Sequence, residues 1–217
     1  MQVATSINPA LYNENVSSHF SVTKVADADF PTRWGHFRIL GFRSKPADDR
    51  RVEEAVALVM GDVVKNTPLV RVHSQCLTGD VFDSLRCDCR DQLEMALRMI
   101  AESGSGVLVY EQQEGRGIGL MPKLQAYELQ DQGRDTVEAN VELGFKADHR
   151  EFEVPAEILR ALGVKQVRLL SNNPQKVAAL ESAGIKVVER VSAEVEFNER
   201  TEKYLKTKKE KMGHLLK

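Results

Sequence analysis

Hydrophobic and polar side chains alternate from Trp34 to Phe42, which is typical of a strand with one buried face. Short apolar runs bounded by glycine, proline or asparagine are typical of buried strands. Such runs predict further strands at residues 55–60, 69–73, 107–110, 167–170 and 186–191. A strand-like pattern also begins at Val22, whereas the polar and charged residues 44–53 predict a surface loop.

Apolar residues at helical spacing predict helices between these strands. In residues 91–102 the apolar side chains recur so that they share one helix face. Asn173 and Pro174 provide a helix start, because asparagine caps the first turn and proline suits its first position. The predicted helices cover residues 91–102, 120–131, 136–143, 155–162, 175–182 and a lysine-rich tail at 199–216. This mixture predicts an α/β fold, a single domain with a mixed β-sheet flanked by helices.

Residues 1–21 are polar and rich in asparagine and serine, so we expect a flexible N-terminal arm before one domain over residues 22–217. The net charge of −2 provides no basic field for nucleic acid. No apolar run approaches the ~20 residues of a membrane span. The first residues also lack the pattern of a signal peptide. We therefore expect a cytoplasmic protein that binds neither nucleic acid nor membranes.

All three cysteines lie in one short stretch, spaced Cys76-x10-Cys87-x-Cys89. Thiolates favour zinc, which takes four ligands in a tetrahedron. Three protein ligands leave the fourth position to water, whose pKa falls to about 7, so the stretch predicts a catalytic zinc site. An odd number of cysteines argues against a disulfide scaffold. Two alternatives remain: three buried cysteines without a metal, and a closed structural site completed by His73.

Two further segments join a predicted strand to a predicted helix. The glycines of residues 114–119 allow close approach of a ligand to the backbone, and helix N-termini attract phosphate. Arg116 could add a charge-assisted hydrogen bond, although a simple turn explains the glycines equally well. In residues 171–176, Lys176 opposes the helix dipole unless an anion lies nearby. Asp148 and Arg150, taken alone, fit a surface ion pair.

Long, ordered motifs resemble GTP cyclohydrolase II from about Val22 to Leu216, so residues 22–217 are expected to form such a catalytic domain. The motifs are Arg71-Val72-His73-Ser74-x-Cys76-Leu77-Thr78-Gly79-Asp80, Ser84-Leu85-Arg86-Cys87-Asp88-Cys89, Gln113-Glu114-Gly115-Arg116-x-Ile118-Gly119-Leu120, residues 129–140, Asn172-Asn173-Pro174-x-Lys176 and residues 208–216. Two positions depart from the family pattern. Gln75 stands where the family usually has glutamate, and Arg90-Asp91 replaces a glycine and an apolar residue.

The resemblance implies zinc-dependent opening of the guanine imidazole ring of GTP, with release of formate and pyrophosphate, as the first step of riboflavin biosynthesis. The product would be a diaminopyrimidinone ribosylamino 5′-phosphate. The resemblance also implies Mg²⁺ at the GTP phosphates and a homodimer. The alternative is a catalytically silent, zinc-stabilised module that senses GTP. A zinc nucleobase deaminase is excluded, because the chain lacks His-x-Glu and Pro-Cys-x-x-Cys.

By the same resemblance, Cys76, Cys87 and Cys89 are the zinc ligands. The positions that match GTP-contacting residues are Arg71, Val72, His73, Ser74, Gln75, Gln92, Glu114, Gly115, Arg116, Thr136, Ser171 and Lys176. The catalytic positions are Tyr127, Asp148 and Arg150, with Asp148 as general base and Tyr127 directing the second hydrolytic event. Arg150 matches a proposed nucleophile at the α-phosphate. A guanidinium stays protonated in proteins, whereas a nucleophile would have to be neutral. Electrostatic stabilisation of phosphate transfer by Arg150 would need no neutral guanidine.

Overall fold

The structure, a computed structural model, describes residues 20–46, 52–146, 148–195 and the single residues Lys209, Gly213 and Leu215. Most of the expected N-terminal arm at 1–21 lies outside the described residues. Most of the tail predicted to be helical at 199–216 lies outside them as well.

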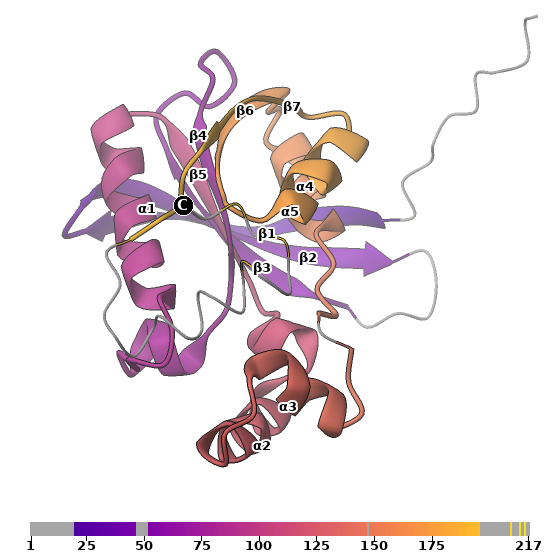
Figure 1. Ribbon diagram of the computed structural model, residues 1–217. Helices are drawn as coiled ribbons and strands as arrows, with labels where there is room; N and C mark the ends of the chain where they lie inside the picture. The colour runs from indigo at the N-terminus through magenta and orange to yellow at the C-terminus, as the bar shows by residue number, and fades with distance from the viewer. Residues whose placement is uncertain are drawn as a thin grey trace, which may run out of the picture.

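Seven strands form one mixed sheet in the order β1-β2-β3-β5-β4-β6-β7 (Figure 1). The pairs along β1, β2, β3 and β5 are antiparallel, and the pairs along β5, β4, β6 and β7 are parallel. The predicted α/β class with a mixed sheet is therefore confirmed. The strands are β1 (Phe20–Thr32), β2 (Gly35–Pro46), β3 (Glu54–Met60), β4 (Leu69–Ser74), β5 (Gly106–Glu111), β6 (Gln166–Leu170) and β7 (Lys186–Val191).

Helices cover both faces of the sheet. Helix α1 (Cys89–Ser103) lies on one face, and α4 (Glu153–Ala161) and α5 (Pro174–Ser182) lie on the other (Figure 1). Helices α2 (Leu120–Asp131) and α3 (Thr136–Glu142) pack on each other beyond the sheet. Two short helical turns, η1 (Leu77–Val81) and η2 (Glu114–Gly117), follow β4 and β5.

The core has two halves because side chains along a strand point to alternate faces. Val107 and Val109 of β5 belong to the half under α4 and α5, and Leu108 between them belongs to the half under α1. Trp34, in the turn between β1 and β2, is partly buried against the α1 half. Each large apolar side chain buried here contributes roughly 1.5–3 kcal/mol.

The predicted elements match the structure with boundary shifts of a few residues, and Asn173 caps α5 as expected, accepting a hydrogen bond from Gln175 N at 2.9 Å. One boundary was wrong. Residues 44–46, assigned to a surface loop, continue β2, because Ser44 N donates to Glu53 O at 2.8 Å and the Ser44 hydroxyl accepts from Glu53 N at 2.7 Å. Within the described part of the chain, no helix has the length and apolar character needed to cross a membrane.

Candidate active site

The candidate site lies at the carboxyl ends of the parallel strands β4 and β5. Ser74 and Glu111 pair as the last residues of these strands, and Gln75 N extends the ladder by donating to Glu111 O at 2.9 Å. The cysteine stretch leaves the sheet at this edge after β4, and the glycine-rich segment leaves it after β5. Open α/β sheets commonly bind ligands outside the carboxyl ends of their strands.

The three cysteine thiols converge as the sequence predicted. Their sulfur atoms lie within 4.8 Å of one another, and the Cys76 and Cys87 sulfurs are 3.7 Å apart. Zinc–sulfur bonds of about 2.3 Å in a tetrahedron place two sulfurs about 3.8 Å apart, so the thiols fit this ion. Among the described His, Cys, Asp and Glu side chains, these three cysteines lie close enough together to share a metal ion.

His73 does not join this cluster. Its Nε2 faces the Asp80 carboxylate, at 3.1 Å from Oδ1 and 3.2 Å from Oδ2, and its ring stacks on Tyr110 at 5.5 Å between centroids. The geometry therefore favours the three-thiol site over the closed site that His73 would complete.

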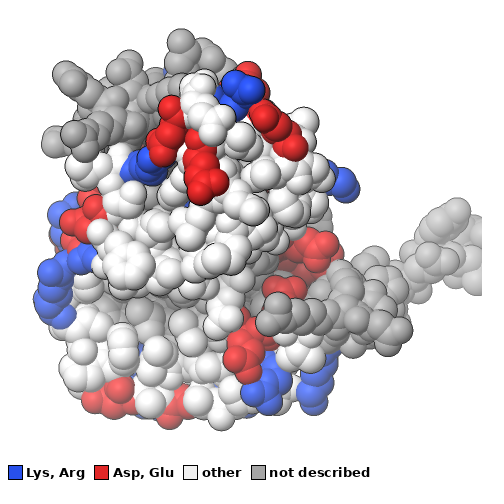
Figure 2. Space-filling model, turned by 90° about the horizontal axis from the view of Figure 1, so that it is seen from below, with Lys and Arg blue, Asp and Glu red and all other residues white. Residues whose placement is uncertain are grey.

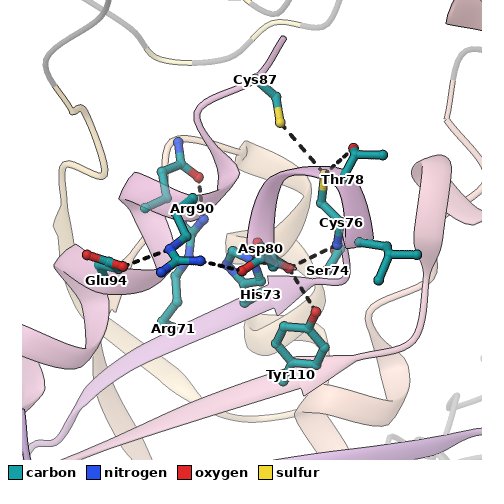
Figure 3. A network of polar contacts seen from close by, with 12 residues as sticks. Arg71, His73, Ser74, Cys76, Thr78, Asp80, Cys87, Arg90, Glu94 and Tyr110 are labelled. Carbon is teal, nitrogen blue, oxygen red and sulfur yellow. Dashed lines mark hydrogen bonds and ion pairs between the residues drawn. The ribbon is translucent and has the colours of Figure 1, made fainter. Parts of the chain in front are cut away.

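Asp80 anchors the backbone of Cys76 (Figure 3). Its carboxylate accepts hydrogen bonds from Cys76 N at 3.0 Å and from the Tyr110 hydroxyl at 2.8 Å, and its own amide donates to Cys76 O at 2.7 Å. Because Asp80 is buried and tied to β4 and β5 through His73 and Tyr110, it fixes Cys76 relative to the sheet.

Gly79 sits inside the η1 turn, directly against the thiols. A Cβ at this position would lie 2.9 Å from the Cys87 sulfur and 3.2 Å from the Cys76 sulfur. Real Cβ atoms do not approach sulfur this closely without displacing it. A side chain at residue 79 would therefore displace the thiols from this arrangement.

Arg90, one of the two departures from the family pattern, points away from the thiols. Its Nη1 donates to Asp80 O at 3.0 Å and its Nε donates to Glu94 at 2.7 Å (Figure 3). The extra cation therefore links η1 to α1 and leaves the thiol cluster intact.

One face of α2 contacts the thiol cluster. The Lys123 Nζ donates to the Cys76 sulfur at 3.2 Å and to Glu114 Oε1 at 2.6 Å. One turn later, the Tyr127 hydroxyl lies 3.1 Å from Thr78 Oγ1, which lies 3.6 Å from the Cys76 sulfur. The Arg86 guanidinium carbon lies 4.8 Å from the centroid of the Tyr127 ring. Tyr127, predicted as catalytic, is thus next to the predicted metal ligands.

The surroundings of Cys76 favour its thiolate form. Hydrogen bonds from the Cys87 and Cys89 thiols, with the nearby Lys123 charge, lower the pKa of Cys76 far below its usual value. The hydrogen bond to Cys76 raises the pKa of Cys87 to about 11. Binding of a metal to all three sulfurs must therefore release protons.

The glycine-rich segment turns sharply at the mouth of the site. Gly115 and Arg116 are consecutive left-handed residues, with φ of 61° at both positions. Gly117 approaches the backbone of His149 so closely that a Cβ would lie 3.1 Å from its carbonyl carbon, and His149 N donates to Arg116 O at 3.0 Å. The turn thus brings the segment after β5 against the loop that carries Asp148 and Arg150.

Asp148 and Arg150 form a close pair. The Asp148 carboxylate accepts from Arg150 Nη2 at 2.5 Å, from Nε at 2.9 Å and from the Arg150 amide at 3.0 Å. Burial opposes ionisation of Asp148, but the Arg150 hydrogen bonds and charge outweigh burial and lower its pKa. Gln113 holds the loop in place, because its side-chain amide donates a hydrogen bond to Glu151 O and accepts one from Glu151 N.

A cavity at this edge of the sheet collects these groups. The predicted site residues on its wall are Ser74, Gln75, Cys76, Cys87, Cys89, Glu114, Gly115, Arg116, Tyr127, Thr136 and Arg150. Figure 2 views the molecule from the side of α2 and α3; uncharged residues cover the centre of this face and charged residues of both signs lie around it. The cationic residues that line the cavity are Arg86, Arg116, Lys123 and Arg150.

The remaining predicted residues do not line this cavity; they are Arg71, Val72, His73, Gln92, Asp148, Ser171 and Lys176. Arg71 is buried and donates to Leu170 O at 3.0 Å and to Gln92 Oε1 at 2.5 Å. Lys176 is also buried and donates to Val72 O at 2.8 Å, and burial holds its pKa well below the usual value. Arg71 belongs to β4 and Lys176 to α5, and both cations are hydrogen-bonded to the protein itself.

The cavity also contains residues that were not among the predicted site residues: Arg86, Gln113, Ile118, Lys123, Ala126, Gln130 and Asn140. Of these, Lys123 and Ala126 lie outside every quoted motif. Lys123 lies four residues before Tyr127 and Gln130 lies three residues after it, so both share its helix face. Helical periodicity around Tyr127 was therefore a signal that could have found them.

The chain is similar to known proteins over most of its length. The family model described as GTP cyclohydrolase II matches residues 23–192. GTP cyclohydrolase-2 of Buchnera aphidicola is 55% identical over 88% of this chain and 97% of its own length. GTP cyclohydrolase-2 of Enterobacter sp. is 56% identical over 89% of this chain and 97% of its own length. Riboflavin biosynthesis protein RibBA of Phocaeicola vulgatus is 53% identical over 90% of this chain, which spans 48% of that longer protein.

Proposed function

Since the chain belongs to the GTP cyclohydrolase II family, we propose that it hydrolyses GTP at a zinc ion held by Cys76, Cys87 and Cys89. The family and the curated enzymes it resembles make this protein a GTP cyclohydrolase II of riboflavin biosynthesis. The proposed reaction opens the guanine imidazole ring and releases formate and pyrophosphate, leaving a diaminopyrimidinone ribosylamino 5′-phosphate.

The observation that carries the proposal is the position of the three thiols in one cavity with Arg116 and Arg150. When bound, zinc with three protein ligands supplies a Lewis acid and a water of lowered pKa. The arginines supply the charge that a triphosphate requires, through charge-assisted hydrogen bonds. We propose Mg²⁺ as a further partner of the GTP phosphates.

Arg150 and Asp148 are proposed to act as one unit. A carboxylate with a lowered pKa is a weak base near neutral pH. The contacts of Asp148 support a role in aiming the Arg150 guanidinium, which would stabilise charge on the α-phosphate during loss of pyrophosphate. Neither residue then needs an unusual protonation state.

Tyr127 is proposed to direct the second hydrolytic event. Burial raises the pKa of its phenol, so the hydroxyl keeps its proton and can donate it in a hydrogen bond. Its position beside Thr78 and Cys76 would let this hydrogen bond orient water or the ring-opened intermediate near the metal.

The buried residues Arg71, Ser171 and Lys176 remain proposed GTP contacts. Contact with GTP would require Lys176 to exchange its hydrogen bond to Val72 O, and Arg71 its bond to Leu170 O, for bonds to the substrate. A homodimer and a cytoplasmic location likewise remain predictions.

Incubating the pure protein with GTP, Mg²⁺ and zinc, and assaying formate and pyrophosphate, tests the proposal. We expect both products in equal amounts. Binding of GTP without formate would instead identify a catalytically silent GTP sensor and overturn the enzymatic reaction. Metal analysis of the same preparation should give one zinc per chain.

A further inference from the structure

Lys123 is the cation in direct contact with a predicted metal ligand. Its Nζ lies 3.2 Å from the Cys76 sulfur and 2.6 Å from Glu114 Oε1, and its side chain is 11% exposed. Among the hydrogen bonds within the described residues, the Cys76 sulfur receives this ammonium contact while Cys87 and Cys89 receive none from a cation. The three sulfurs are therefore not equivalent.

The surroundings hold Lys123 in this position. Its Cβ and Cδ pack on Gly115, where a Cβ would lie 3.1 Å from the Lys123 Cβ. Glu114 is fixed in turn, because its carboxylate accepts from Leu77 N at 2.7 Å and from Gly115 N at 2.9 Å. Leu77 directly follows Cys76, so the ion pair and the metal ligand belong to one rigid unit.

The position of Lys123 in its helix indicates that nearby anions hold it there. It is the fourth residue of α2, and the first turn of this helix contains no acidic residue. The helix dipole stabilises anions at this end and opposes cations. A cation is favourable here only if anions close to it outweigh the dipole, and Cys76 and Glu114 are those anions.

A pairing with Glu114 alone would not require the contact with sulfur. An ammonium group carries three protons, and the structure directs one toward a carboxylate and another toward a thiolate. Zinc with three thiolates has a net charge of about −1, and Lys123 compensates this charge at one particular sulfur.

We propose that Lys123 is a positioning residue of the metal centre, which donates a hydrogen bond to the Cys76 thiolate and so makes Cys76 the least nucleophilic of the three ligands. The inference rests on the proposed zinc site. It assigns the ligands unequal roles: Cys87 and Cys89 bind the metal as full donors, and Cys76 shares its charge with Lys123.

The proposal predicts a selective change in thiolate reactivity. Loss of a hydrogen bond to a charged group changes an equilibrium about ten- to hundredfold. The nucleophilicity of a thiolate follows its basicity with a Brønsted coefficient of about 0.4–0.5. In a zinc-loaded Lys123→Met protein, Cys76 should therefore react with iodoacetamide about three- to eightfold faster than in the wild type.

The experiment maps the alkylation of each cysteine by peptide mass spectrometry in zinc-loaded wild type, Lys123→Met and Lys123→Arg. We expect faster modification of Cys76 in Lys123→Met, unchanged rates at Cys87 and Cys89, and near wild-type behaviour in Lys123→Arg, which keeps a cationic donor. A double variant, Lys123→Met with Glu114→Gln, avoids an unpaired buried carboxylate and should show the same selectivity. Arg86→Gln is the matched control, since it removes a cavity cation that contacts Tyr127 and no sulfur.

An unchanged or slower Cys76 reaction in both Lys123→Met proteins, with zinc retained, would overturn the inference. Equal acceleration at all three cysteines would also overturn it, because that result indicates a loosened site. A comparable acceleration in Arg86→Gln would show that charge at a distance is sufficient and would contradict the hydrogen-bond role. The zinc content of the wild type is measured first, and its absence would overturn the proposed function independently of any variant.

Discussion

The hydroxyl of Tyr127 lies 3.1 Å from Oγ1 of Thr78, and this threonine follows Cys76 by two residues. The contact joins α2 to the η1 turn at the predicted metal. A phenol held here is well placed to act on whatever binds beside Cys76.

Tyr127→Phe should accumulate the formylated pyrimidine while GTP is still consumed. The lost hydrogen bond costs roughly 1–3 kcal/mol, or about ten- to hundredfold on the deformylation step. Mass spectrometry of the products against time measures this. Production of only the deformylated compound at the wild-type rate would show that Tyr127 merely packs.

The serine variants of Cys76, Cys87 and Cys89 should each lose zinc, whereas His73→Ala should retain it. The reason is that His73 Nε2 faces Asp80 and lies outside the thiol group. Metal analysis with X-ray absorption should show three sulfur ligands in the wild type. A nitrogen ligand that disappears in His73→Ala would contradict this geometry.

Gly79→Ala should weaken zinc binding, because its new Cβ would lie 2.9 Å from the Cys87 sulfur. Overpacking of this kind costs about 1–3 kcal/mol, which corresponds to roughly ten- to hundredfold in affinity. Competition with a chelator measures the affinity. Gly41→Ala is the control, since its Cβ would meet Ala26 at an ordinary 3.4 Å and should leave zinc binding unchanged.

Arg150→Gln should reduce the release of pyrophosphate about 10²–10³-fold, as expected when one preorganised group is removed from a charged transition state. Zinc content should not change, because the side-chain hydrogen bonds of Arg150 go to Asp148 and not to a predicted zinc ligand. Single-turnover assays of pyrophosphate measure the effect. A loss of GTP binding with an unchanged rate at saturation would assign Arg150 to binding alone.

Asp148→Asn should make the free energy of unfolding less dependent on pH in the acidic range. Burial works against the carboxylate, but Arg150 holds its folded pKa below the usual 3.8. A carboxyl group with a lowered folded pKa stabilises the protein above its unfolded pKa, and this contribution is lost as pH falls through the folded value. Wild-type stability should therefore fall more steeply than that of the variant below about pH 4. Urea titrations at pH 7 and at two acidic values measure the difference.

The sequence predicted the strands and most helices because the spacing of apolar residues along the chain determines each of them. The continuous apolar run Val107, Leu108 and Val109 reflects a strand buried on two faces, and the structure divides these residues between the two core halves. The thiol cluster was predictable for a similar reason, since a short loop joins Cys76 to Cys87.

Other features depend on contacts that no local pattern contains. Lys123 reaches Cys76 only because the left-handed turn at Gly115 and Arg116 aims α2 at the thiols. Lys176 has the sequence signature of an exposed anion-binding lysine, yet the packing of Phe152 and β4 buries it. Tertiary packing decided both outcomes.

Trp34 gives the protein an intrinsic optical reporter. It is the single tryptophan of the chain, it packs against the core half under α1, and its neighbour Arg33 bonds Glu94 of that helix at 2.6 Å. The first residue of α1 is Cys89, the third thiol. We therefore expect tryptophan emission to report on the docking of the helix that supplies this ligand, and fluorescence of the unlabelled protein to follow loading and loss of the metal.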